Sequence, residues 1–167
     1  MLYLLDANVF ITAKNTYYPI DRVPEFWEWL IYQGEQGSVK IVQEVYDEIH
    51  GGKDDLSLWA KEDEVANALL LDEDADVNQV RDVIEQGYAN DLTDDEVEKL
   101  GRDPFLIAYA MSDIDNRIVV TTEVSKASKQ RANRRVPDVC DNFNVKCIDT
   151  FRLTSDLDFS TNWKSRR

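Results

Sequence analysis

The chain contains few of the residues that nitrogen and sulfur chemistry requires. Its 167 residues include one histidine, His50, and two cysteines, Cys140 and Cys147. A single histidine excludes every mechanism that needs two. The cysteines fit neither a disulfide framework nor the spacing of a zinc site, so we expect a reduced thiol pair. Any chemistry must therefore rest on carboxylates.

Long apolar segments are also absent. No run approaches the ~18 residues that a membrane span needs. The stretch Leu2–Leu5 has no basic residues before it and stops at Asp6, unlike a signal peptide. These absences predict a cytoplasmic protein with no membrane partner. A length of 167 residues and an ordinary globular composition, 43% hydrophobic and 31% charged, argue for one domain over residues 1–167.

Positive charge is scarce overall but concentrated locally. The net charge of -14 speaks against a protein that holds nucleic acid by overall positive charge. Residues 44–103 contain 20 acidic and 5 basic residues, whereas residues 117–135 carry six basic residues against Glu123 alone. Because most charge runs are simply solvated surfaces, nucleic-acid contact by 117–135 starts as the minority interpretation.

The apolar pattern predicts an α/β fold. Four short apolar runs are typical of buried parallel strands, at 2–5, 40–42, 118–120 and 145–148. Helical patterns lie between them, from Pro24 to about Gln33, around Val45 and Ile49, and from Asp103 onward. We expect a three-layer α/β/α architecture with a mostly parallel central sheet of four to five strands. Residues 54–101 are predicted as an acidic helical insertion and residues 154–167 as a polar tail.

Four acidic residues stand at chemically useful places in this pattern. Asp6 and Glu123 follow predicted strands directly, where open α/β sheets bind their ligands. Asp103 opens the helix before strand 118–120, and Glu48 lies on the helix after strand 40–42. Each has a plainer alternative: Asp6 as a structural residue, Asp103 as a simple N-cap, and Glu48 as a surface residue.

Four segments together resemble the PIN-domain nucleases, in particular the small toxin-type bacterial or archaeal members. The segments are Tyr3–Ile11 with Asp6 and Asn8, Val45–Ile49 with Glu48, Gly101–Ala110 with Asp103, and Ile118–Glu123. Their order and predicted elements agree with the motifs of that family, and they span residues 3 to 123.

The match also departs from the family pattern. The fourth acid of the family is usually Asp, whereas this chain has Glu123. Glu44 and Asp47 compete with Glu48 for the second acidic position, although Glu48-Ile49 is the better match. Asp141 is either an extra ligand or a surface acid, and we favour the surface acid.

Convergent carboxylates need compensation. At ~4 Å and an effective dielectric near 20, each like-charge pair costs about 4 kcal/mol. Either the pKa values rise or a divalent cation binds, and hard oxygen ligands favour Mg²⁺ or Mn²⁺. We assign catalysis and metal coordination to Asp6, Glu48, Asp103 and Glu123. Asn8 and Thr121 are expected to support them by hydrogen bonds.

The resemblance implies a divalent-metal-dependent endoribonuclease that hydrolyses RNA phosphodiester bonds. Lys126, Lys129 and Arg131 are then the expected contacts to RNA phosphates. Many small PIN proteins are toxins inhibited by an antitoxin protein, which makes an antitoxin a second expected partner. Trp27, off the apolar face of its helix, is at most a hint of such a surface, with a core position and a plain surface position as equal alternatives. A homodimer stays open.

Two rival interpretations remain from the sequence. The first is a catalytically silent PIN-like scaffold that binds RNA or a protein, which the exchange of Asp for Glu123 keeps open. The second is another Mg²⁺-dependent α/β domain. A haloacid-dehalogenase-type phosphatase requires Asp two residues after Asp6, where this chain has Asn8. A receiver domain requires paired acids before the strand-end Asp, and Asp6 has no acidic neighbour.

Overall fold

The computed structural model describes residues 1–166 and contains a four-stranded, wholly parallel sheet. The strands are β1 (Leu2–Leu5), β2 (Val39–Lys40), β3 (Arg117–Val120) and β4 (Lys146–Ile148), in the order β2-β1-β3-β4. In the register of the central strands Leu4 lies opposite Val119. A parallel bridge between Ile41 and Leu70 adds a fourth, isolated pairing. The predicted parallel sheet of four to five strands is confirmed.

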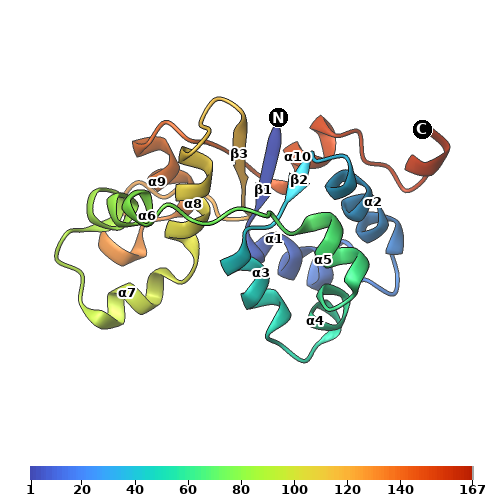
Figure 1. Cartoon of the computed structure of the whole chain (residues 1–167), viewed down its shortest axis with the longest axis horizontal. Helices are drawn as coiled ribbons and strands as arrows, with labels where there is room; N and C mark the ends of the chain where they lie inside the picture. The colour runs from blue at the N-terminus through green and yellow to red at the C-terminus, as the bar shows by residue number, and fades with distance from the viewer. Residues whose placement is uncertain (167) are drawn as a thin grey trace.

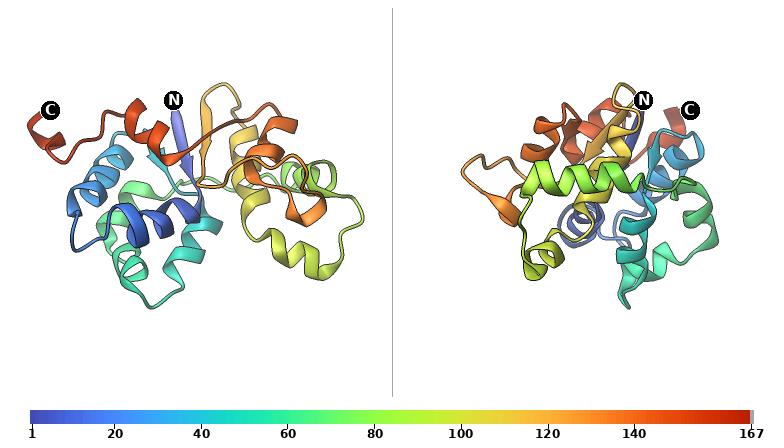
Figure 2. Two further views of the ribbon diagram at one scale, coloured as in Figure 1. Left: turned by 180° about the vertical axis from the view of Figure 1, so that it is seen from behind. Right: turned by 60° about the vertical axis from the view of Figure 1, so that its left-hand side comes forward.

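Helices flank the sheet on both sides, which confirms the three-layer α/β/α fold (Figures 1 and 2). The α-helices are α1 (Ala7–Thr12), α2 (Pro24–Glu35), α3 (Gln43–His50), α4 (Asp55–Ala60), α5 (Asp63–Leu69), α6 (Val77–Asp82), α7 (Asp94–Leu100), α8 (Asp103–Met111), α9 (Val136–Asn142) and α10 (Thr150–Asp156). Two π-helical turns, η1 (Ala13–Tyr17) and η2 (Val83–Tyr88), and two 3₁₀ turns, η3 (Arg131–Asn133) and η4 (Trp163–Arg166), complete the elements.

The core explains why these segments form strands and helices. Leu4, Leu5, Val119 and Val120 are fully buried, as expected for central parallel strands covered on both faces. A cluster of aromatic rings lies beside the sheet under α1, α2 and α4.

Trp27 belongs to this aromatic cluster, so its core position is the alternative that holds, and it is not part of an exposed partner surface. Its side chain is 2% exposed, and its ring centroid lies 4.8 Å from that of Trp59 on α4. Its indole nitrogen donates a hydrogen bond to the Tyr18 carbonyl. The helical pattern of α2 alone could not show that α4 covers its second side.

The acidic segment 54–101 is helical, as predicted, and it packs into the domain. Helices α4 and α5 contact α3 and α2, and α6 contacts α8. The predicted polar tail is also packed rather than loose, because Trp163 is buried and donates a hydrogen bond to the Glu25 carbonyl. Within residues 1–166 no helix is long and apolar enough to cross a membrane.

The strand order creates one natural crevice. From β1 the chain passes to β2 on one side, while β3 pairs with the other side of β1. Ligands of open α/β sheets bind beyond the carboxyl ends of strands at such a switch point. Asp6 follows β1 there, and Thr121 follows β3.

Candidate active site

Asp6 is fixed at the switch point by hydrogen bonds from two side chains. The Thr121 hydroxyl donates to Asp6 Oδ2 at 2.8 Å, and the Asn8 amide donates to the same oxygen. The Asn8 carbonyl oxygen in turn accepts from the Thr122 backbone N–H at 2.9 Å. The structure therefore places Asn8 and Thr121 where the sequence predicted them, as supports of Asp6.

Burial and neighbouring negative charge weaken the acidity of Asp6. The side chain is nine-tenths or more buried, and this burial is the largest cause that raises its pKa to about 6. The Thr121 hydrogen bond lowers the pKa, whereas the carboxylates of Glu123 and Glu48 raise it. Two of the predicted partner acids therefore act electrostatically on Asp6.

Asp103 is a largely buried carboxyl without a hydrogen-bond donor. It is the first residue of α8, whose N-cap is Arg102, and the Arg102 side chain makes no capping hydrogen bond. None of residues 1–166 donates a hydrogen bond to Asp103. The alternative of a simple N-cap is therefore wrong. Burial is the largest cause that raises the pKa of Asp103 to about 8, followed by the charges of Asp6, Glu123 and Glu48.

Glu48 is the acid of α3 whose charge influences Asp6 and Asp103. It is exposed, and its charge raises the pKa values of both Asp6 and Asp103. Its competitors have other partners: burial and then the charge of Glu44 raise the pKa of Tyr109, and Asp47 accepts a hydrogen bond from Gln43 at 2.7 Å. Glu48 therefore lies at the rim of the crevice rather than on an unrelated surface.

Glu123 reaches the crevice but is held by α9. One oxygen accepts a hydrogen bond from the Val136 backbone N–H at 2.8 Å, and the other pairs with Arg135 at 3.3 Å. Its charge still contributes to the raised pKa values of Asp6 and Asp103. Glu123 therefore supports the first turn of α9 and adds negative charge to the crevice.

The donor set fits a hard divalent cation in its chemistry. All four acids supply oxygen, and Asp103 has no donor to neutralise it. Among the described residues, no three His, Cys, Asp or Glu side chains stand as a group that could hold a metal ion. Mg²⁺ keeps several waters and needs only one or two carboxylates. Asp6 and Asp103 are the residues that can hold such an ion directly.

Tyr88 is a residue of this site that sequence reasoning missed. Its side chain is buried, and its hydroxyl has no hydrogen-bond partner among residues 1–166. Burial is the largest cause that raises its pKa, followed by the charge of Asp103. It ends the π-helical turn η2 inside the acidic segment, where no motif marks it. Only tertiary packing brings it to the acids.

The structure also places Arg131 and Asp141, and Asp141 is exposed, as the favoured interpretation of a surface acid predicts. Arg131 is engaged in ion pairs with Asp91 at 2.7 Å and Glu96 at 2.8 Å, so it anchors α7 instead of facing solvent freely. Asp141 lies on α9 in a hollow with Met1 and Lys146, at the amino ends of the strands and away from Asp6. By contrast, Lys126 and Lys129 make no ion pair with any described residue.

The fold and site together define a three-layer α/β/α domain with interacting acidic residues at the switch point of its sheet. The chain belongs to the DUF4411 family, described as a domain of unknown function, which matches residues 3–161. No curated protein and no solved structure matches the chain. The comparisons establish this family, and the resemblance to PIN domains stays a prediction.

Proposed function

We propose that this protein is a divalent-metal-dependent endoribonuclease that hydrolyses RNA phosphodiester bonds. The observation that supports this most is the convergence of Asp6, Glu48, Asp103 and Glu123, from four different elements, on the switch point. Burial first, and neighbouring carboxylate charge after it, raises the pKa values of Asp6 and Asp103. A divalent cation is the ligand that such a crevice favours.

Each side chain has a defined task in the proposed reaction. A bound Mg²⁺ or Mn²⁺ would supply an activated water and stabilise charge on the leaving oxygen. Asp6 and Asp103 would hold the ion, and Asn8 and Thr121 keep the Asp6 carboxylate in one orientation. Glu48, exposed at the rim, would accept the proton from the attacking water.

The loop between β3 and α9 supports RNA as the substrate. Lys126 is exposed and Lys129 is half-buried, and neither ammonium group is neutralised by a described residue. The loop begins directly after Glu123, so both lysines lie within a few residues of this acid in the sequence. Lysines in this position would contact the phosphates of a bound strand.

The resemblance to small PIN proteins supports three further parts of the proposal. The protein would act as the toxin of a toxin–antitoxin pair, with an antitoxin protein as its partner. It would work in the cytoplasm, in keeping with its two free cysteines, Cys140 and Cys147. A homodimer would be its assembly state.

A second candidate is a silent scaffold that binds RNA or protein without cleaving it. The observation in its favour is the engagement of Glu123 by Val136 and Arg135, which uses the acid for structure. In a silent scaffold the crevice would keep its charge without turning over substrate.

The test is cleavage of single-stranded RNA by the purified full chain in Mn²⁺. We expect cleavage that stops in chelator and is lost in Asp103→Asn, which removes the charge without removing a hydrogen bond. Asp141→Asn is the matched control, since it makes the same change away from the crevice. Cleavage that continues in chelator would overturn the metal mechanism, and no cleavage by the parent would favour the scaffold.

A further inference from the structure

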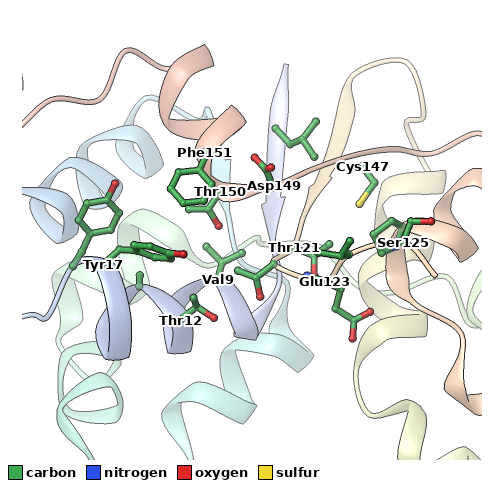
Figure 3. Close-up of a pocket in the computed structure, with 16 residues that line it drawn as sticks. Val9, Thr12, Tyr17, Thr121, Glu123, Ser125, Cys147, Asp149, Thr150 and Phe151 are labelled. Atoms are coloured by element: carbon green, nitrogen blue, oxygen red, sulfur yellow. The ribbon is translucent and has the colours of Figure 1, made fainter.

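A groove of about 600 Å³ opens beside the carboxylate crevice (Figure 3). Thr121 and Glu123 form the end next to the acids, and Val9 lies midway along it. The far end is formed by Tyr17 and Phe151. The groove is thus continuous with the site proposed for hydrolysis and leads away from it.

Two exposed aromatic rings form that far end. Tyr17 is 50% exposed and Phe151 is 57% exposed, and their ring centroids lie 5.2 Å apart in an edge-to-face arrangement. Tyr17 ends the π-helical turn η1, a type of turn that is frequent at functional sites. Most other aromatic side chains of the domain are in the core. An exposed pair at the mouth of a groove is a surface suited to stacking a flat ring.

The polar groups of the groove favour an uncharged ligand group. Its lining contains no Lys, Arg or His, and it includes the acids Glu123 and Asp149. A phosphate would be repelled there. The lining also includes the hydroxyl of Thr12, a group that can donate to or accept from a bound ring.

The cations stand just outside the groove. Ser125 is part of the lining, and the next residue, Lys126, is exposed and unpaired among the described residues. A strand that placed a base in the groove could therefore keep its phosphates near Lys126 and Lys129. A volume of about 600 Å³ lies within the roughly 300–1,000 Å³ of ligand pockets.

We propose that this groove binds an unpaired nucleobase of the substrate strand against the exposed rings of Phe151 and Tyr17. The inference rests on the proposed function, because it names how the same site selects single-stranded RNA. A base in the groove positions the neighbouring phosphate at the carboxylates. A paired base could not enter, so the groove discriminates against duplex.

The test measures binding without cleavage. The full chain, in chelator, is titrated into single-stranded RNA octamers that carry 2-aminopurine at one position in turn. We expect fluorescence quenching at one position, because the base stacks there. Phe151→Leu and Tyr17→Leu should weaken binding about tenfold and abolish the quenching, because stacking is lost. Phe151→Trp is the matched control and should keep both.

The outcomes separate this proposal from the proposed hydrolysis. RNA that is bound with quenching but not cut in Mn²⁺ would support the groove and remove the nuclease. If RNA is cut but affinity and quenching are unchanged in both leucine variants, base binding in the groove is wrong while the proposed hydrolysis stands. The groove would then be a candidate surface for a protein partner. No saturable RNA binding by the parent would overturn base binding in the groove as well. Competition by free adenosine monophosphate at the affinity of the strand would overturn the assignment to a strand.

Discussion

Asp103 shows how the fold prepares a carboxyl for a ligand that is not protein. Arg102, not Asp103, occupies the N-cap of α8, so the Asp103 carboxylate is left without the usual capping role. It is largely buried, receives no hydrogen bond from any described residue, and shares its crevice with three other acids. Such an arrangement destabilises the ionised form until a cation compensates it.

The stability of the metal-free protein should therefore fall as the pH rises. Asp103 has a pKa of about 8 in the folded chain against an ordinary 3.8, so between these values only the folded state holds the proton. Between pH 6 and pH 8 we expect the free energy of unfolding to fall by up to about 1.4 kcal/mol per pH unit. Urea unfolding in chelator at both pH values measures this.

The matched variant for this pH effect is Asp103→Asn, which cannot ionise. It should remove most of the decline between pH 6 and pH 8, because the pKa of Asp6, about 6, places its own contribution mainly below that range. Parallel pH dependences in parent and variant would contradict the electrostatic state assigned to Asp103.

At the scale of elements, Glu123 couples the end of β3 to the start of α9. Its longer side chain reaches the Val136 backbone N–H, while its charge acts on Asp6 and Asp103. This dual position gives a physical reason for Glu rather than the shorter Asp at position 123.

Substitutions of Glu123 should separate its two roles. Glu123→Asp shortens the side chain, so it should lose the hydrogen bond to Val136 and reduce stability by about 1 kcal/mol. Glu123→Gln keeps the length, so it should keep that hydrogen bond and most of the stability while it lowers RNA cleavage. Thermal unfolding and cleavage rates measure both effects. Full activity in Glu123→Gln would limit the residue to a structural role.

The features that could be predicted from the sequence are those set by residues close together in the chain. The four strands follow from short apolar runs, and Asp103 was found because Pro104 marks a helix start. The neighbours of Glu123 and the place of Tyr88 could not be predicted, because each depends on a segment distant in sequence. The same reason hides the cover of Trp27 by α4 and the engagement of Arg131 by the acidic segment.

At the scale of the whole molecule, some of the acids behind the net charge of -14 interact with other residues of the fold. Two acids of the segment 54–101, Asp91 and Glu96, form ion pairs with Arg131. Outside that segment, the charges of Asp6, Glu48 and Glu123 act on Asp103. Lys126 and Lys129 are left without an ion pair among the described residues. A protein of this charge is therefore expected to hold RNA through few phosphate contacts and to depend on its metal for cleavage.

The double variant Lys126→Glu with Lys129→Glu tests this charge distribution. We expect weaker RNA binding and a plot of log affinity against log salt that is flatter by roughly 0.7 for each lost contact. Binding measured between low and moderate salt gives the slope. Arg131→Ala serves as the comparison, because its guanidinium is engaged by Asp91 and Glu96. Equal slopes for the parent and the lysine variant would reject this surface.

The most direct test follows RNA cleavage and melting temperature together while Mn²⁺ is added to the full chain. If Asp6 and Asp103 hold the catalytic ion, both should rise over the same range of Mn²⁺ concentration, and Asp6→Asn should lose both responses. A variant Asp6→Asn that is stabilised and activated by Mn²⁺ like the parent would place the metal elsewhere and contradict the proposed site.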